Sequence, residues 1–253
     1  MKKYAKPTQK EFVEFYKHHT GRETAHHFEI AYSTVSKYAR EYAIPRRSFR
    51  HKEVLAELTQ RQLEIFNGSM LGDGCLEEVE TEKSNSRFIE KHGIQQVGYA
   101  RWKFDELKPF SSSFTISKEI YDYCKFGTIN HPCFTILEKI WYDENRKKRV
   151  PIELKITPLT LAIWYFDDGY NNKNARNITI YTNGFKHDEV ELLASKIKIL
   201  GIHNCSVIKS SQKNGCRPIV YIGRSSYSDF LDIVNNYVPS QCLAYKVETY
   251  GKV

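Results

Sequence analysis

Two short stretches of this chain resemble each other, and this repetition constrains the fold more than any other feature. The first covers residues 66–74 (FNGSMLGDG) and the second covers residues 161–169 (LAIWYFDDG). Each is an apolar run of helical length that ends in an acid followed by glycine, and the two acids, Asp73 and Asp168, lie 95 positions apart. Similar strand-like and helix-like segments follow each stretch. The chain therefore contains an internal duplication that brings one acid into each half.

A carboxylate at the C-terminal end of a buried helix lies in an unfavourable place, because the helix dipole opposes its charge and the apolar run leaves it little water. A neighbouring cation would offset that cost. An Asp-Gly pair also occurs simply because glycine favours the left-handed conformation that ends many helices. Two copies, each with a helix start before it and a β-rich segment after it, favour a site with two equivalent halves.

With their flanking segments, these motifs resemble the LAGLIDADG homing endonucleases in their single-chain form with two motifs. The resemblance covers roughly residues 59–246, and residues 156–169 (ITPLTLAIWYFDDG) are its most specific part. It implies an α+β fold of two pseudo-symmetric αββαββα repeats that form a saddle of antiparallel sheets. A small N-terminal helical unit precedes the repeats. We expect three domains, at 1–50, 51–151 and 152–253.

Two glycines in the first motif helix predict a close helix pair. Gly68 and Gly72 lie four positions apart, so they face the same side of the helix. Glycine within a helix costs about 1 kcal/mol relative to alanine, so this stripe predicts the close approach of another backbone. The second motif helix carries Ala162 followed by three large side chains. Its sequence leaves open how closely the two helices approach along their length.

The resemblance implies that Asp73 and Asp168 are catalytic acids that hold a divalent metal, each associated with cutting one DNA strand. Hydrolysis of a phosphodiester needs an activated water and charge neutralisation at phosphorus, and divalent ions held by carboxylates supply both. Mg²⁺ is the expected cofactor, and Mn²⁺ is expected to replace it. Gly72 and Asp167 precede the two acids and are included in the candidate metal site. Asp167 has either a direct or a supporting, structural role there.

Two lysines match the positions of basic residues in similar enzymes. Lys148 stands shortly before one Val-Pro pair, and Lys246 follows a second. The resemblance implies that both are catalytic, with an ammonium group that polarises water or offsets developing charge. The alternative for each is a solvated surface charge or a phosphate contact outside the cleavage centre. Nothing in the sequence indicates a covalent nucleophile or a histidine-metal nuclease.

A formal net charge of +8 and a pI of about 9.0 indicate an anionic partner. Residues 8–18 and 22–28 predict short helices, and Ser33 is a good N-cap for a third helix over 34–42. This arrangement resembles a helix-turn-helix, whose second helix enters the major groove. The alternative is a helical cap that packs on the main body and contacts no DNA.

In each repeat, a sheet covered by helices on one face leaves the other face for DNA. A polar outer face is also the default for any half-buried sheet, so charge and duplication decide in favour of DNA. The candidate contacts come from the third N-terminal helix, the basic tail behind it, and both repeats. They are Ser33, Thr34, Ser36, Lys37, Arg40, Arg46, Arg47, Arg87, Lys91, Asn177, Thr179, Tyr181, Lys209, Lys213 and Arg217.

Composition also bounds the environment of the protein. The six cysteines are scattered without close pairs, which favours reduced thiols over a zinc site or a disulfide framework. The sequence contains no signal peptide and no stretch that would span a membrane. We therefore expect a soluble intracellular protein, from a bacterial or phage cytoplasm or an organelle matrix.

The resulting hypothesis is a site-specific endonuclease that acts on double-stranded DNA. The resemblance implies a long, roughly pseudo-palindromic target and products with 3′ overhangs. A duplicated chain already carries both halves of the site, so we expect a monomer. The alternative functions are an RNA-splicing maturase, which would bind intron RNA, and a DNA-binding regulator that does not cleave.

Overall fold

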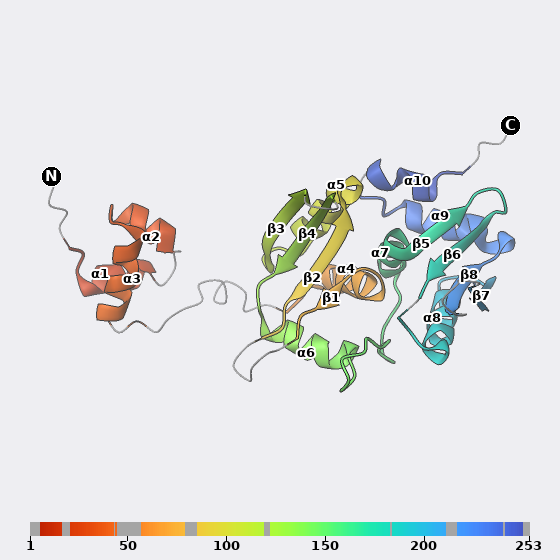
Figure 1. The fold of residues 1–253 in the computed structure, drawn as a ribbon, viewed down its shortest axis with the longest axis horizontal. Coiled ribbons are helices and arrows are strands. Elements are labelled where there is room, and N and C mark those ends of the chain that lie inside the picture. Colours follow the sequence, from red (N-terminus) through yellow and green to blue (C-terminus); the bar gives the residue numbers. More distant parts are fainter. Residues whose placement is uncertain are drawn as a thin grey trace. The chain divides into compact units, whose positions relative to one another are not determined.

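The computed structural model describes residues 6–16, 21–42, 44, 57–78, 85–118, 122–182, 184–210, 217–239 and 241–249. They belong to two compact units, which span Met1–Leu55 and Ala56–Val253 (Figure 1). Three candidate DNA contacts, Arg46, Arg47 and Lys213, lie outside the described residues.

The N-terminal unit contains three short helices around one buried phenylalanine. They are α1 (Gln9–Tyr16), α2 (Gly21–His27) and α3 (Tyr32–Glu41). The ring of Phe12 is fully buried and stacks on Tyr16 and Phe28. Aromatic packing of this kind holds the three helices together with little other apolar surface.

The expectation that Ser33 caps the third helix is wrong. The N-cap is Ala31, whose backbone is extended, and it makes no side-chain capping bond. The Ala31 carbonyl accepts the N–H of Thr34 at 2.8 Å, so the helix begins at Tyr32. Ser33 therefore lies inside the first turn.

The larger unit contains two repeats with the same order of elements. The first repeat consists of α4 (Gln60–Leu71), β1 (Cys75–Leu76), β2 (Phe88–Gly93), the 3-10 turn η2 (Ile94–Gln96), α5 (Val97–Glu106), β3 (Ser111–Lys118), β4 (Asp122–Thr128) and α6 (Pro132–Trp141). The second consists of α7 (Pro158–Asp168), β5 (Gly169–Asn172), β6 (Asn177–Tyr181), α8 (His187–Ile199), β7 (Cys205–Lys209), β8 (Pro218–Ile222), η3 (Arg224–Ser226), α9 (Tyr227–Asn235), η4 (Gln241–Leu243) and α10 (Ala244–Val247).

Each repeat forms one antiparallel four-stranded sheet. The strand orders are β1-β2-β4-β3 and β5-β6-β8-β7, so the two sheets have the same topology. Figure 1 shows α4 and α7 side by side between the two sheets. The expected α+β architecture of two pseudo-symmetric repeats is thus confirmed.

The two motif helices begin with the same chemistry. The side chain of Thr59 accepts the N–H of Gln62 and that of Gln62 accepts the N–H of Thr59, which together form a capping box. At the start of α7, the Thr157 hydroxyl accepts the N–H of Thr160 at 3.1 Å, and Pro158 follows the cap. These threonines satisfy backbone donors that the first helical turn leaves without partners.

The predicted close approach of the motif helices is confirmed. A Cβ atom on Gly68 would lie 2.6 Å from the Cβ of Ile163, and a Cβ on Gly72 would lie 2.5 Å from the Cβ of Asp167. Both distances are shorter than any tolerated contact, so only glycine fits. The contacts advance together along both helices, so α4 and α7 run parallel and their C-terminal ends lie together.

Helices cover one face of each sheet and form the core with it. In the first sheet Phe88 and Phe126 face inward, and in the second Ile178, Ile180 and Val220 do so. Among the described helices, none is long and apolar enough to cross a membrane. The opposite faces of both sheets carry the polar residues of each strand.

Candidate active site

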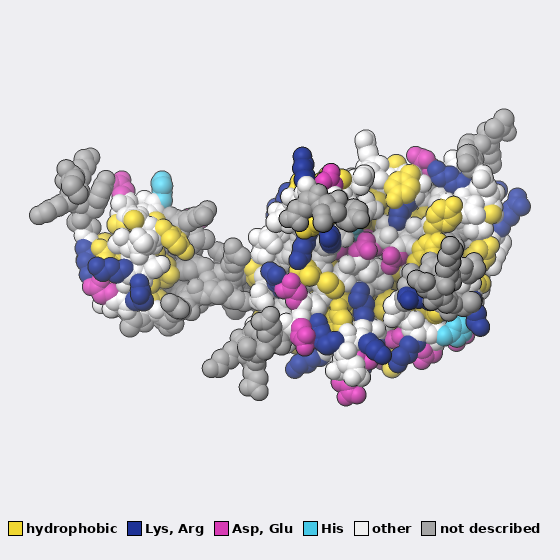
Figure 2. Space-filling view, in the orientation of Figure 1, with side chains coloured by type: hydrophobic (Ala, Val, Ile, Leu, Met, Phe, Trp, Pro, Cys, Tyr) yellow, Lys and Arg dark blue, Asp and Glu magenta, His cyan; other side chains and the backbone are white. Residues whose placement is uncertain are grey.

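The two motif acids emerge together because α4 and α7 end together. The side chain of Asp73 is 40% exposed, whereas Asp168 is half-buried. Burial raises the pKa of Asp168 to about 6, and the charge of Asp73 contributes to the increase. The two carboxylates are thus close enough to repel each other, which is a property of acids that share a bound cation. Figure 2 shows acidic side chains gathered over the ends of α4 and α7.

Each motif helix is capped at its C-terminal end by one of the predicted lysines. The ammonium group of Lys148 donates to the carbonyls of Gly72, at 3.3 Å, and Gly74, at 2.7 Å. The ammonium group of Lys246 donates to the carbonyls of Phe166, at 2.5 Å, and Asp167, at 3.3 Å. A positive charge at this end of a helix is favoured by the helix dipole.

Both lysines are held in place from within the fold. Lys148 forms an isolated antiparallel bridge with Tyr142, just after α6. Lys246 lies in α10, and its own carbonyl accepts the hydroxyl of Tyr165 and the amide of Asn171. Burial lowers the pKa of both lysines, against the opposite effect of the acids nearby. Asp73, Asp168 and the two lysines are therefore brought together at one place.

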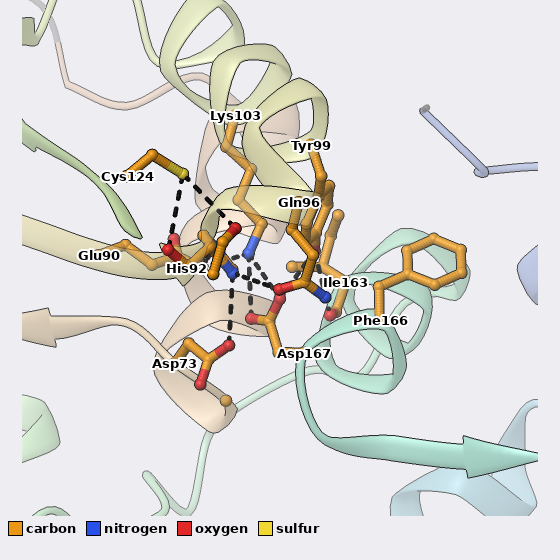
Figure 3. A network of polar contacts seen from close by, with 12 residues as sticks. Asp73, Glu90, His92, Gln96, Tyr99, Lys103, Cys124, Ile163, Phe166 and Asp167 are labelled. Carbon is orange, nitrogen blue, oxygen red and sulfur yellow. Dashed lines mark hydrogen bonds and ion pairs between the residues drawn. The ribbon is translucent and has the colours of Figure 1, made fainter. Parts of the chain in front are cut away.

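A buried polar network lies directly beneath Asp73 and involves side chains from three elements. Glu90 and His92 come from β2, Lys103 comes from α5 and Asp167 comes from α7 (Figure 3). The Lys103 ammonium donates to Glu90 Oε1 at 2.5 Å and to Asp167 Oδ1 at 2.8 Å. The Tyr99 hydroxyl donates to the same Asp167 oxygen at 2.9 Å. Asp167 thus anchors the second motif helix in the interior of the first repeat.

The imidazole of His92 connects this network to the first motif acid. Its Nε2 lies 2.8 Å from Glu90 Oε1, and its Nδ1 lies 3.5 Å from Asp73 Oδ2. Burial alone would lower the pKa of His92, but the Glu90 carboxylate raises it above its usual value. Nδ1 also lies 3.3 Å from the amide oxygen of Gln96, so both ring nitrogens face oxygen atoms.

The two buried carboxylates of the network differ in their pKa values. Burial would raise the pKa of Glu90, but Lys103 and His92 lower it to about 2. Burial raises the pKa of Asp167 to about 7 against the effect of Lys103, because Glu90 and Asp73 add negative charge nearby. One ammonium shared by two carboxylates stabilises the charge of Glu90 more completely than that of Asp167.

Two sets of groups at this place could hold a metal ion. Within the described part of the chain, Asp73, His92 and Asp167 have ligand atoms within 4.8 Å of one another. Lys103 already occupies the side chain of Asp167, and Glu90 already binds the His92 ring. The set that better fits Mg²⁺ consists of oxygens: the carboxylates of Asp73 and Asp168, with the main-chain carbonyls of Gly72 and Asp167. Each of these carbonyls accepts from one lysine at 3.3 Å and keeps a second lone pair.

Sequence reasoning missed four members of the buried network, namely Glu90, His92, Tyr99 and Lys103. Two signals could have found them. Glu90 and His92 lie two and four positions after the buried Phe88, so all three side chains are on the same, inward face of β2. Lys103 falls on the buried side of α5, four positions after Tyr99. Charged residues at core positions are uncommon and point to a functional or structural pairing.

The open face of the first sheet carries basic and hydroxyl groups. Lys91, Lys125 and Thr115 lie opposite one another across three strands. The Lys91 ammonium lies 3.6 Å from the ring centre of Tyr123. Arg87, just before β2, forms an ion pair with Glu77 at 2.5 Å. Both predicted DNA contacts of this sheet are therefore at its solvent side.

The open face of the second sheet carries aromatic and hydroxyl groups instead. Thr179, Tyr221 and Ser206 lie opposite one another, and Tyr181 lies on the same face. Asn177 begins β6 on this face, and Arg217 is exposed just before β8. Figure 2 shows Lys and Arg over β2 and β4 but hydrophobic side chains over β5 and β6.

Lys209 lies differently from the other candidates in this sheet. It alternates with Ile208 and so shares the strand face of Val207 and Cys205, which is the face that α8 covers. It is exposed because it ends the strand. In the N-terminal unit, Ser33, Ser36, Lys37 and Arg40 are exposed on α3, and Thr34 is half-buried.

Residues 63–230 match the LAGLIDADG DNA endonuclease family. The chain is 28% identical over 204 residues to the probable intron-encoded endonuclease 1 of Wickerhamomyces canadensis, a match that covers 74% of this chain and 84% of that protein. It is 28% identical over 217 residues to the cytochrome b mRNA maturase bI2 of Saccharomyces cerevisiae. That match covers 78% of this chain but only 49% of the maturase.

One solved structure is similar over nearly its whole length. It is the homing endonuclease I-WcaI bound to its DNA recognition sequence, with a TM-score of 0.69 and 25% sequence identity. The match covers 83% of this chain and 97% of that one.

Proposed function

This chain belongs to the LAGLIDADG DNA endonuclease family, and from this we propose that it cuts both strands of a long, specific DNA site. The reaction requires a divalent cation, Mg²⁺ or in its place Mn²⁺, and leaves 3′ overhangs. One chain carries both halves of the site, so the active form is a monomer. Homing of the genetic element that encodes it, whether an intron, an intein or a free-standing gene, is the corresponding biological role.

The observation that carries this proposal is the parallel packing of α4 and α7. It delivers one acid from each repeat to a single place, and a lysine caps each helix there. A protein that only binds DNA has no need of two acids that repel each other. Two neighbouring carboxylates are favourable only when a cation between them offsets their repulsion.

The roles of the side chains follow from their positions. A bound divalent cation supplies an activated water and neutralises charge on the phosphate. Asp73 and Asp168 hold that cation, together with the helix-end carbonyls of Gly72 and Asp167. Lys148 and Lys246 place positive charge beside the developing charge of the reaction. Burial lowers the pKa of both lysines, so they are better proton donors near neutral pH.

DNA lies along the open faces of the two sheets in this proposal. The basic face of the first sheet contacts phosphates, and the tyrosines and hydroxyl groups of the second contact bases and sugars. The exposed side of α3 supplies a second contact, as in a helix-turn-helix. Its contribution is checked by footprinting: the protected site should shorten when residues 1–50 are removed.

Cleavage of a randomised duplex library with Mg²⁺ tests the proposed function. Wild-type protein should produce double-strand breaks at one site, and the double variant Asp73→Asn with Asp168→Asn should produce none. Asp188→Asn, at an exposed acid of α8, is the matched control and should cut like the wild type. A wild type that binds one sequence but never cuts it would refute the nuclease.

A second function is favoured by one observation, the similarity to maturase bI2 of Saccharomyces cerevisiae. In that case the protein would bind intron RNA and assist splicing, with or without DNA cleavage. A splicing assay on the RNA of the host intron distinguishes the two activities. The acid variants should leave splicing unchanged if the two activities use separate surfaces.

A further inference from the structure

The two motif acids have different surroundings even though the backbones around them correspond. Strand pairing sets the correspondence: Cys75 lies opposite Ile89 in the first sheet, and Tyr170 lies opposite Thr179 in the second. Cys75 and Tyr170 each follow the glycine that ends the motif. Ile89 and Thr179 are therefore equivalent positions.

Counting on from these positions, Glu90 corresponds to Ile180 and His92 corresponds to Thr182. All four residues are buried. Ile180 makes an apolar contribution to the core, and the Thr182 hydroxyl donates to a local carbonyl, that of Pro218, at 2.5 Å. The fold of a repeat therefore does not require charged groups at these positions.

Burying charged side chains at these positions costs free energy, so their presence in one repeat needs an explanation. Removing an ion from water costs several kcal/mol, and pairing inside the protein seldom yields a net gain over apolar packing. Lys103, Glu90 and the side chain of Asp167 are all inaccessible to solvent. In α8, the buried positions are occupied only by apolar residues: Val190, Leu193, Ala194 and Ile197.

The contacts of the buried network form a chain that leads from Asp167 to the first motif acid, Asp73. Asp167 binds Lys103, Lys103 binds Glu90, and the same Glu90 oxygen binds the His92 ring. The ring is also held by the edge of Tyr99, at 5.3 Å between ring centres. Its remaining nitrogen, Nδ1, lies 3.3 Å from Gln96 Oε1 and 3.5 Å from Asp73 Oδ2 (Figure 3). Among the described residues, no side chain is hydrogen-bonded to the carboxylate of Asp168.

We propose that His92, held by Glu90 and Lys103, is a positioning residue that orients the carboxylate of Asp73, so that the two halves of the cleavage centre are built differently. The first half is preorganised by a rigid buried network, whereas the second depends on the bound cation for its geometry. This inference rests on the proposed nuclease function. Its consequence is that the two DNA strands respond unequally when the network is broken.

The test is strand-resolved cleavage under single-turnover conditions, with each strand of the target duplex labelled at one end. His92→Phe keeps an aromatic ring against Tyr99 but removes the ring-nitrogen contacts to Asp73, Glu90 and Gln96. It should slow one strand about tenfold relative to the other, the usual scale for groups that orient metal ligands, and nicked DNA should accumulate. Thr182→Val, at the equivalent buried position of the second repeat, should change both strands alike.

Two further variants separate positioning from loss of folding. Glu90→Gln keeps the shape of the network but removes the charge that holds the ring, and it should slow the same strand. His92→Gln restores a group that can bond to Asp73 and should recover part of the lost rate. If all of these proteins unfold cooperatively but slow both strands equally, the positioning role is wrong.

A binding measurement provides a readout that does not depend on cleavage. Mn²⁺ is titrated by calorimetry into metal-free wild-type protein and into His92→Phe. One class of sites should weaken about tenfold in the variant, and the other should be unchanged. Equal affinities in both proteins would overturn the inference. A wild type that cuts neither strand would instead overturn the proposed function on which it rests.

Discussion

The two repeats of the larger unit have the same backbone topology but differ in the buried side chains next to their motif acids. Both sheets have the same strand order, and both motif helices start at a threonine and end at a capping lysine. Beneath Asp73 the interior is ionic, with Lys103 shared between two carboxylates. Beneath Asp168 the corresponding positions are apolar or satisfied locally. The shared fold of the two repeats therefore does not account for the ionic network, which lies in the first repeat and at its contact with α7.

The same difference extends to the open faces of the sheets. Lys91 and Lys125 make the first face basic, whereas Thr179, Tyr181 and Tyr221 make the second neutral and aromatic. The two repeats are equivalent scaffolds, and each carries its own chemistry on its open face. A target for such a protein need not be symmetric, because the two halves present different groups to it.

Removing the central cation of the network should have the largest effect on stability. Lys103→Met leaves two buried carboxylates without their shared partner, and it should lower the free energy of unfolding by about 3–5 kcal/mol. The measurement is urea denaturation followed by circular dichroism. Ile197→Met, in the apolar interior of the other repeat, is the control and should cost less than about 1.5 kcal/mol. A Lys103→Met loss as small as that would show that the network contributes little.

The next effect tests what the repeats have in common, the close packing of their motif helices. A Cβ on Gly68 would lie 2.8 Å from the carbonyl oxygen of Thr160, and backbone atoms cannot move aside easily. Gly68→Ala should therefore destabilise the protein by about 2–3 kcal/mol, as overpacking of a core does. At Gly184 a Cβ would meet no described atom within 4 Å. Gly184→Ala should be nearly neutral, and equal effects at both glycines would contradict the packing.

The burial of Asp168 and the negative charge of Asp73 nearby predict a pH-dependent stability in metal-free protein. The folded pKa of about 6 lies above the ordinary value of 3.8, so the folded state binds the proton more tightly. Stability from this group is present below pH 4 and is lost as the pH rises through 6. Asp168→Asn should stabilise the metal-free protein by about 1–2 kcal/mol at pH 8 and have no effect at pH 3.5. Thermal unfolding at both pH values in EDTA measures this, and a destabilised variant at pH 8 would contradict the account.

The smallest expected effect distinguishes the open faces of the two sheets. Lys91→Ala removes a proposed phosphate contact, so the slope of log Kd against log salt should fall by about 1. Thr179→Val, on the neutral face, should change affinity for particular sequences and leave the salt slope unaltered. Fluorescence anisotropy with the cognate duplex in Ca²⁺ over a series of salt concentrations provides both values. Identical slopes for wild type and Lys91→Ala would remove Lys91 from the phosphate contacts.

Local signals in the sequence were sufficient for most of the fold. The capping threonine before α4, the stripe of Gly68 and Gly72, and the bounds of β7 and β8 all follow from residue type and periodicity. The strand β5 was not predicted, because its sequence GYNN has low strand propensity and pairs only through β6. The short helix α10 was also missed, since four residues carry almost no periodic signal.

The candidate site was predictable only where a residue carried its own pattern. Asp73 and Asp168 come from the duplication, and the two lysines come from a family resemblance. Lys103 has the spacing of a buried position in α5, but no local pattern identifies its partner, Asp167, which α7 supplies. Contacts between residues that are 64 positions apart, such as this one, depend on tertiary packing that periodicity cannot supply. For the same reason, the inward turn of Asp167 could not be told from a role as metal ligand.

The central claim is that one acid from each repeat forms a common cleavage centre. Its most direct test is cleavage of the cognate duplex in Mg²⁺ by wild type, Asp73→Asn and Asp168→Asn, with DNA affinity measured in parallel. We expect double-strand breaks by wild type, none by either variant, and DNA affinity within about threefold of wild type for both. Double-strand cleavage by either single variant at the wild-type rate would contradict it.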